Sequence, residues 1–129
     1  MRTLILAILL ATLPQCAQIE ADGRSTPKPW GRCTFTQYAA KFEGRRCADG
    51  STFRHRNLTV ACRHLPLGSR ITLRYWSGKR WVAVPVTVTD RGGLPLHRKD
   101  RPQFDLSRET ARQLGLYQKR KNYREGEWR

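Results

Sequence analysis

The carboxyl group of Asp90 is placed where it could take part in catalysis. Asp90 ends an apolar segment, residues 84–89, in which every second residue is a valine. This period of two predicts a half-buried strand that delivers the acid to its rim. An arginine and two glycines follow at residues 91–93, a loop that can take unusual backbone angles. Asp90 could therefore work in general acid–base catalysis or simply cap a turn, and these residues leave both interpretations open.

A second acid, Asp105, stands just before the one segment with a clear helical pattern. Ser107 can cap this helix, Glu109 suits the positive end of its dipole, and Gly115 closes it. Its narrow apolar face would be formed by Leu106, Ala111 and Leu114. Asp105 is thus either a partner carboxylate for Asp90 or an acid placed to start a helix.

The elements that must position these acids are mostly strands. Strand patterns cover residues 33–38, 58–62, 70–76 and 79–89, and Ser77-Gly78 between the last two indicates a hairpin. Residues 92–103 read as a long loop, and residues 117–129 form a polar, basic tail without a convincing strand. Several short strands with one good helix predict a mainly β fold, a small barrel in a single domain.

The N-terminus has the features of an export signal. Arg2 precedes an almost wholly apolar run, residues 3–13, and Pro14 breaks it, so residues 1–21 are predicted to be a signal peptide. Residues 22–32 then read as a polar linker. The apolar run is short for a membrane span, so no stable span is expected after cleavage. The expected location is periplasmic or secreted, with an uncleaved anchor or a lipid on Cys16 as alternatives.

The charge of the chain points to an anionic partner. The sequence has 25 Lys and Arg against 10 Asp and Glu, a formal net charge of +15. Such an excess attracts anionic polymers, whether cell wall, membrane surface or nucleic acid. The signal segment favours an extracytoplasmic, anionic cell-wall polymer over nucleic acid. Steeply salt-dependent binding to DNA would indicate the nucleic-acid alternative.

The cysteines do not form a metal-binding pattern. After signal cleavage Cys33, Cys47 and Cys62 remain, an odd number that allows three single pairings in an oxidising compartment. No close Cys-x-x-Cys pair with histidines is present, so no zinc site is predicted.

Six ordered motifs resemble the RlpA-like (rare lipoprotein A) domain family. Residues 65–71 resemble its Leu-Pro-x-Gly-Thr-x-Val segment, and residues 88–92 its Val-x-Asp-Arg-Gly motif. The remaining matches are Phe42-Glu43-Gly44-Arg45-Arg46 with Ala48-Asp49-Gly50-Ser51-Thr52-Phe53, Leu58-Thr59-Val60-Ala61, Ser77-Gly78-Lys79, and Asp105-Leu106-Ser107 with Ala111 and Leu114-Gly115. The motifs cover most of the chain after the signal.

This resemblance implies a six-stranded double-psi β-barrel over residues 33–116, with the helix after its Asp-Leu-Ser motif. The tail, residues 117–129, would have to supply the last strand. Some family members are lytic transglycosylases that cleave peptidoglycan glycan strands, and expansins share the barrel. No cofactor is implied. An enzyme of this kind needs one acid that then serves as base, because the muramic acid hydroxyl is itself the nucleophile.

The resemblance assigns the acid/base role to Asp90 and makes Asp105 the second catalytic candidate. Two departures matter: Ser51 stands where the family usually has Glu, and Cys62 where it usually has His. Cys47 also stands at a position where the family commonly has Thr, so a Cys47–Cys62 disulfide is expected. The alternative function is therefore an expansin-like module that binds or loosens glycan without cleaving it.

Six residues are predicted to contact the substrate. Arg91 and Arg45 could attract carboxylates, and His64 could replace the missing histidine. Aromatic rings at Tyr38 and Trp76 could stack on sugar faces or belong to the core. Ser51 is included because it stands at the motif position where the family usually has Glu.

Overall fold

The computed structural model describes residues 27–93, 95–117 and 123–129. Its elements are, in chain order, β1 (Gly31–Gln37), the 3₁₀ turn η1 (Ala40–Phe42), β2 (Thr59–Ala61), β3 (Arg70–Trp76), β4 (Trp81–Asp90), β5 (Gln103–Leu106), α1 (Arg108–Gln113) and β6 (Arg124–Trp128). The expected mainly β fold with one short helix is confirmed.

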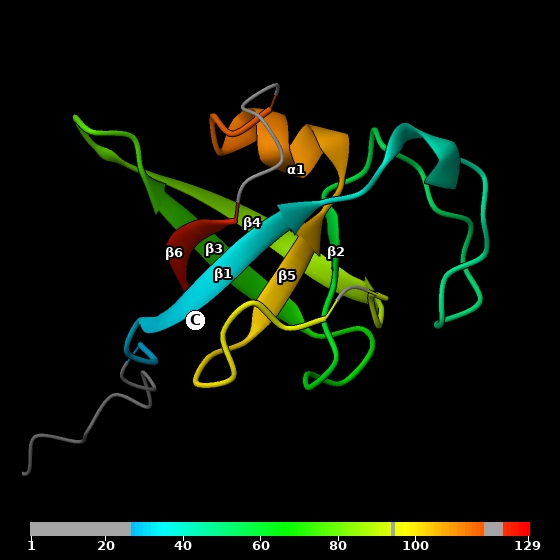
Figure 1. Ribbon diagram of the computed structural model, residues 1–129, viewed down its shortest axis with the longest axis horizontal. Helices are drawn as coiled ribbons and strands as arrows, with labels where there is room; N and C mark the ends of the chain where they lie inside the picture. The colour runs from blue at the N-terminus through cyan, green and yellow to red at the C-terminus, as the bar shows by residue number, and fades with distance from the viewer. Residues whose placement is uncertain (1–26, 94, 118–122) are drawn as a thin grey trace, which may run out of the picture.

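The six strands form one closed barrel in the order β1-β5-β2-β4-β3-β6. Two neighbouring pairs, β1 with β5 and β2 with β4, are parallel, whereas the other pairs are antiparallel. Figure 1 shows β1 and β5 running side by side across the front of the barrel, with β2 beyond β5. The short strand β2 therefore lies between β5 and β4, the two strands that carry the candidate acids.

The core fills the barrel and extends beneath the helix. Along β4, Val84, Val86 and Val88 are buried as their alternation predicts. Large fully buried side chains from β1, β3 and β5 meet them, and Leu114 and Leu116 attach the helical segment to the same cluster. Ser107 caps α1, because its Oγ accepts a hydrogen bond of 3.2 Å from the Thr110 N–H.

Two elements differ from the sequence prediction. Residues 103–106 form β5, where the end of a loop was expected. The strand was not predicted because all four side chains are buried, so no alternation of buried and exposed residues marks it. β1 begins at Gly31, inside the predicted linker of residues 22–32. The predicted tail contains β6, which pairs with both β1 and β3 and closes the barrel.

The predicted signal peptide (residues 1–21) and residues 118–122 of the predicted basic tail lie outside the described residues. Within the part of the chain that the structure describes, no helix is both long and apolar enough to cross a bilayer.

Candidate carboxylate site

A β-bulge brings the two acids to one face of the barrel. Val60 of β2 pairs with Val88, but the next residue, Ala61, pairs with Asp90, so β4 contains one extra residue at this point. A bulge of this kind re-aims the side chains that follow it. Ala61 also pairs with Asp105 of β5 on its other side. Because paired residues of neighbouring strands point to the same face, Asp90, Ala61 and Asp105 share one face at the end of β2.

Three donors hold the Asp90 carboxylate. The Tyr38 hydroxyl donates to Oδ2 at 2.9 Å, and the N–H groups of Ala48 and Arg91 donate to Oδ1 at 3.0 and 2.9 Å. Burial raises the pKa of the Tyr38 hydroxyl, and its hydrogen bond to Asp90 raises it further. Tyr38 is therefore a protonated donor at any physiological pH, and Asp90 has a fixed orientation at the half-buried end of β4.

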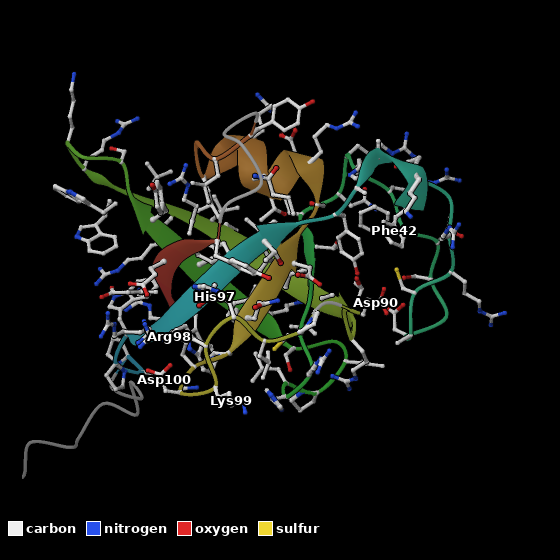
Figure 2. All side chains as sticks on the ribbon, in the orientation of Figure 1. Phe42, Asp90, His97, Arg98, Lys99 and Asp100 are labelled. Carbon is white, nitrogen blue, oxygen red and sulfur yellow. The ribbon has the colours of Figure 1, made fainter. Side chains whose placement is uncertain are left out.

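An aromatic group positions the Tyr38 ring. Its centroid lies 4.4 Å from that of Phe53 and 5.5 Å from that of Phe42, which belongs to η1. Figure 2 shows Phe42 and Asp90 at the same end of the molecule, with the labelled residues of the 97–100 loop segment lying away from them. The packing thus fixes Tyr38 as a hydrogen-bond donor to Asp90, a role that the sequence did not suggest for it.

The side chain of Asp105 is more deeply buried than that of Asp90. It is only 7% exposed, and the Thr36 hydroxyl donates a hydrogen bond to its Oδ1. Burial raises the pKa of Asp105 to about 6, while Arg63 lowers it and the charge of Asp90 raises it. Asp105 can therefore hold a proton close to neutral pH, a chemical property beyond the helix-starting role that its place in the sequence also allows.

The glycine after Arg91 allows the chain to pass close to Asp105. Gly92 has a φ of +71°, and a Cβ placed on it would lie 2.5 Å from Asp105 Oδ2 and 3.5 Å from the Ala61 Cβ. The loop therefore covers Asp105 in a way that only glycine permits.

The loop of residues 47–51 borders Asp90 on a second side. The Asp49 N–H donates to the Thr89 carbonyl at 3.1 Å, next to the Ala48 contact with Asp90. Ser51 is exposed, and its Oγ donates to Asp49 Oδ1 at 2.5 Å. Ser51 therefore lies in the loop that carries the Ala48 donor, where it stabilises the turn.

The expected Cys47–Cys62 disulfide is not formed in the structure. Both residues are buried free thiols, and Cys33 is a third. Cys47 contacts the side chains of Ser51 and Thr89, whereas Cys62, 1% exposed, belongs to the barrel core. The two sulfurs thus have separate environments, and burial raises the pKa of the Cys47 thiol.

Among the described contacts, the side chains of Arg91, Arg45 and His64 make none with the Asp90 carboxylate. The Arg91 guanidinium donates to the carbonyls of Cys62 and Leu65, at 3.0 and 2.5 Å, and so holds the loop after β2. Arg45 is exposed, with its guanidinium 5.5 Å from the Phe42 ring centre. His64 is exposed in the loop that Arg91 holds.

Trp76 lies far from the acids. It pairs with Trp81 at the beginning of β4, whereas Asp90 is at the end of that strand. At about 3.3 Å per residue, the two ends of β4 are roughly 30 Å apart. Trp76 and Trp81 are 46% and 44% exposed and their ring centres lie 5.6 Å apart, so they form a separate aromatic surface at the hairpin.

Three contributors to the site were not anticipated: Thr36, the Ala48 N–H and Gly92. Only the Asp-Arg-Gly sequence hinted at one of them, since a glycine beside a functional acid often marks a close approach. Among the residues that the structure describes, no group of three or more His, Cys, Asp or Glu side chains could hold a metal ion. The site is therefore two carboxyl groups, one hydrogen-bonded and half-exposed, the other buried with a raised pKa.

Comparison with known proteins identifies the family of the barrel. A family model described as lytic transglycolase matches residues 34–126. A probable endolytic peptidoglycan transglycosylase RlpA from Synechocystis sp. is 35% identical over 80 residues, which are 62% of this chain and 23% of that protein. An uncharacterized protein from the same organism is 33% identical over 79 residues, 61% of this chain and 77% of that protein. The chain thus spans about a quarter of the length of its RlpA relative. Since the family match covers all six strands apart from the outermost residues of β1 and β6, the chain belongs to the lytic transglycolase family, the RlpA-like double-psi β-barrels.

Proposed function

We propose that this domain cleaves the glycan strands of peptidoglycan as a lytic transglycosylase, with Asp90 as the acid/base residue. The observation that carries the proposal is the pairing of Ala61 with both Asp90 and Asp105, which sets two carboxyl groups on one face. Family membership and the similarity to a probable peptidoglycan transglycosylase support the choice of substrate.

The chemistry needs two proton transfers at one carboxyl group. A carboxyl group first donates a proton to the leaving glycosidic oxygen, and the C1–O bond breaks. The muramic acid hydroxyl then attacks C1, and the resulting carboxylate takes its proton, which leaves an anhydro end. Asp90 is half-exposed and oriented by Tyr38, so it is the carboxyl that can reach a polymer. Asp105, with its pKa of about 6, is the neighbouring group that can keep a proton available.

Digestion of sacculi tests the proposal. The purified protein is incubated with intact sacculi and with sacculi freed of stem peptides, and the soluble products are analysed by mass spectrometry. The wild type should release anhydromuropeptides, and Asp90→Asn should not, while Asp100→Asn, an exposed acid in the 91–102 loop, should act like the wild type. Equal product from Asp90→Asn would refute the role of Asp90.

A second candidate function is glycan binding without cleavage. The specific observation is that the positions where the family usually has Glu and His offer no further acid or base: Ser51 is bonded to Asp49, and Cys62 is a core thiol. In addition, both oxygens of Asp90 already accept hydrogen bonds, one from the Tyr38 hydroxyl and the other from two backbone N–H groups. Sedimentation of the protein with sacculi, without any anhydro product, would favour this function.

Export to the cell envelope belongs to the same proposal. The N-terminal signal pattern and the formal charge of +15 suit a protein that works on an anionic wall outside the cytoplasm.

A further inference from the structure

A cationic pocket lies beside α1, and neither Asp90 nor Asp105 lines it. A pocket of about 550 Å³ is lined by four arginines, two glutamates and one histidine: Arg54, Arg56, Arg108, Arg112, Glu43, Glu109 and His55. We call it the arginine pocket. It is formed where the loop of residues 54–57 meets the start of α1, a junction fixed by the hydrogen bond of 2.9 Å from the Glu109 N–H to the His55 carbonyl.

Both glutamates of the arginine pocket already have cationic or N–H partners. Glu43 accepts from the His55 N–H at 2.7 Å and from Arg54 at 3.4 Å. Glu109 accepts from Arg112 at 2.8 Å. These contacts lower the pKa of both carboxyl groups, chiefly through the His55 N–H for Glu43 and through Arg112 for Glu109. The acids therefore neutralise Arg54 and Arg112 and leave two positive charges over.

The remaining charges are those of Arg56 and Arg108. Neither side chain has an anionic partner among the described residues, and the Arg108 guanidinium lies 5.8 Å from the centre of the Tyr117 ring. Two uncompensated guanidinium groups on one concave surface suit an oxyanion, since each offers a planar fork of N–H donors to a carboxylate or phosphate.

The arginine pocket is also linked to the carboxylate site. His55 is 7% exposed, and its ring lies 4.8 Å from that of Phe53, which in turn packs on Tyr38, the donor to Asp90. The Arg108 N–H donates to His55 Nδ1 at 3.3 Å, so a continuous series of side-chain contacts connects the start of α1 with Asp90.

We infer that the arginine pocket is an anion-binding subsite that holds a carboxylate or phosphate group of the wall polymer through Arg56 and Arg108. The inference rests on the proposed function for the identity of the polymer. The carboxylates would come from stem peptides, and the phosphates from phosphodiester-linked wall polymers.

Binding to sacculi by the whole protein tests this subsite. The double variant Arg56→Ala/Arg108→Ala should bind intact sacculi about tenfold more weakly than the wild type, because two charge-assisted contacts are lost. The matched control is Lys79→Ala/Arg80→Ala, which removes the same charge from the exposed hairpin at the other end of β4 and should change binding less than about twofold. Arg56→Lys/Arg108→Lys should keep part of the affinity. Equal losses in the pocket variant and the hairpin control, or no loss in the pocket variant, would overturn the inference.

Two treatments of the sacculi distinguish the anions. If the pocket binds carboxylates, removal of stem peptides with an amidase should abolish the difference between wild type and double variant. If it binds phosphates, removal of phosphate-bearing polymers should do so instead. A difference that survives both treatments would contradict both stem-peptide carboxylates and wall-polymer phosphates as the ligand.

Cleavage of peptide-free glycan separates this result from the proposed function. From glycan freed of both stem peptides and phosphate-bearing polymers, the double variant should release product at the wild-type rate. Asp90→Asn should release none, yet it should still bind intact sacculi through the arginine pocket. Normal cleavage by Asp90→Asn would end the proposed function and leave the pocket result standing.

Discussion

The Tyr38 hydroxyl donates a hydrogen bond of 2.9 Å to Asp90 Oδ2, across 52 positions of the chain. Tyr38 follows β1 and Asp90 ends β4, so the bond ties together two strands that are not neighbours in the barrel. Its loss should leave the Asp90 carboxylate held only by the two N–H groups at Oδ1.

Tyr38→Phe tests this bond. The variant keeps the ring packing with Phe53 but leaves Asp90 without one donor, so the free energy of unfolding should fall by about 1–2 kcal/mol. Urea unfolding measures the change, and the sacculus digestion should slow in parallel. Tyr75→Phe is the control, because the Tyr75 hydroxyl has no hydrogen-bond partner among the described residues. Equal stability losses in the two variants would contradict a special role for the Tyr38 hydroxyl.

The pKa of Asp105 predicts how stability depends on pH. Burial raises this pKa to about 6 in the folded protein, above its ordinary value of 3.8, so the folded state binds more protons between these values. Stability should therefore fall as pH rises from about 4 to about 7, by an amount on the order of 2–3 kcal/mol from this residue.

Asp105→Asn should remove that part of the pH dependence. Urea unfolding at about pH 4 and about pH 7 gives the change for each protein, and the difference between variant and wild type isolates Asp105. Asp100→Asn should leave the Asp105 contribution in place, because the Asp100 pKa is lowered by Arg101 instead. The same pH slope in Asp105→Asn and wild type would show that Asp105 does not titrate as described.

Gly92→Ala should disturb Asp105 directly. Its Cβ would lie 2.5 Å from Asp105 Oδ2, in addition to the strain of a φ of +71°. Gly115→Ala is the matched control, since Gly115 has a φ of +79° and no atom lies within 4 Å of the place that its Cβ would take. We expect Gly92→Ala to lose about 1–3 kcal/mol more stability than the control, and to lose glycan cleavage as well. Equal costs would mean that the loop moves away freely.

Cys62→His should not create an active family-type site. Cys62 is 1% exposed and packs in the core, so an imidazole there is both too large and too polar. The variant should lose about 2 kcal/mol or more of unfolding free energy, and Cys62→Ala should lose less. A stable His variant with faster cleavage would show that the position can open to the site.

Trp76→Ala should leave cleavage of short glycan fragments within about twofold of the wild type. Trp76 lies roughly 30 Å from Asp90 along β4, beyond the reach of a fragment of a few sugars. Mass spectrometry of the released product checks this. A strong loss of activity on short fragments would contradict the prediction, because it would mean that the substrate extends along the whole length of β4.

Local patterns in the sequence predicted much of the barrel. β3 was predicted with its observed bounds, and the alternating valines indicated the inward face of β4. β5 was missed because its four residues are all buried, covered by the core on one face and by loops on the other, which erases the period of two. β6 was hard to recognise because its Arg-Glu-Gly-Glu-Trp sequence is polar and only partly buried.

The candidate site was predicted in its parts and not in its arrangement. Asp90 and Asp105 could be named from their motifs, but their common neighbour, Ala61, follows from pairings between strands far apart in the chain. The bulge that turns Asp90 toward Asp105 has no local signal either. Trp76 shows the converse: an aromatic residue that looked suitable by type lies at the wrong end of its strand.

The position of β6 also bears on how the protein is made. It is the last of the six strands to be synthesised, and it alone joins β1 to β3. Until it has emerged, both of those strands have unpaired backbone edges that could join another unfinished chain. Folding should therefore wait for these few polar residues, and a delay in their synthesis should show as aggregation of the barrel.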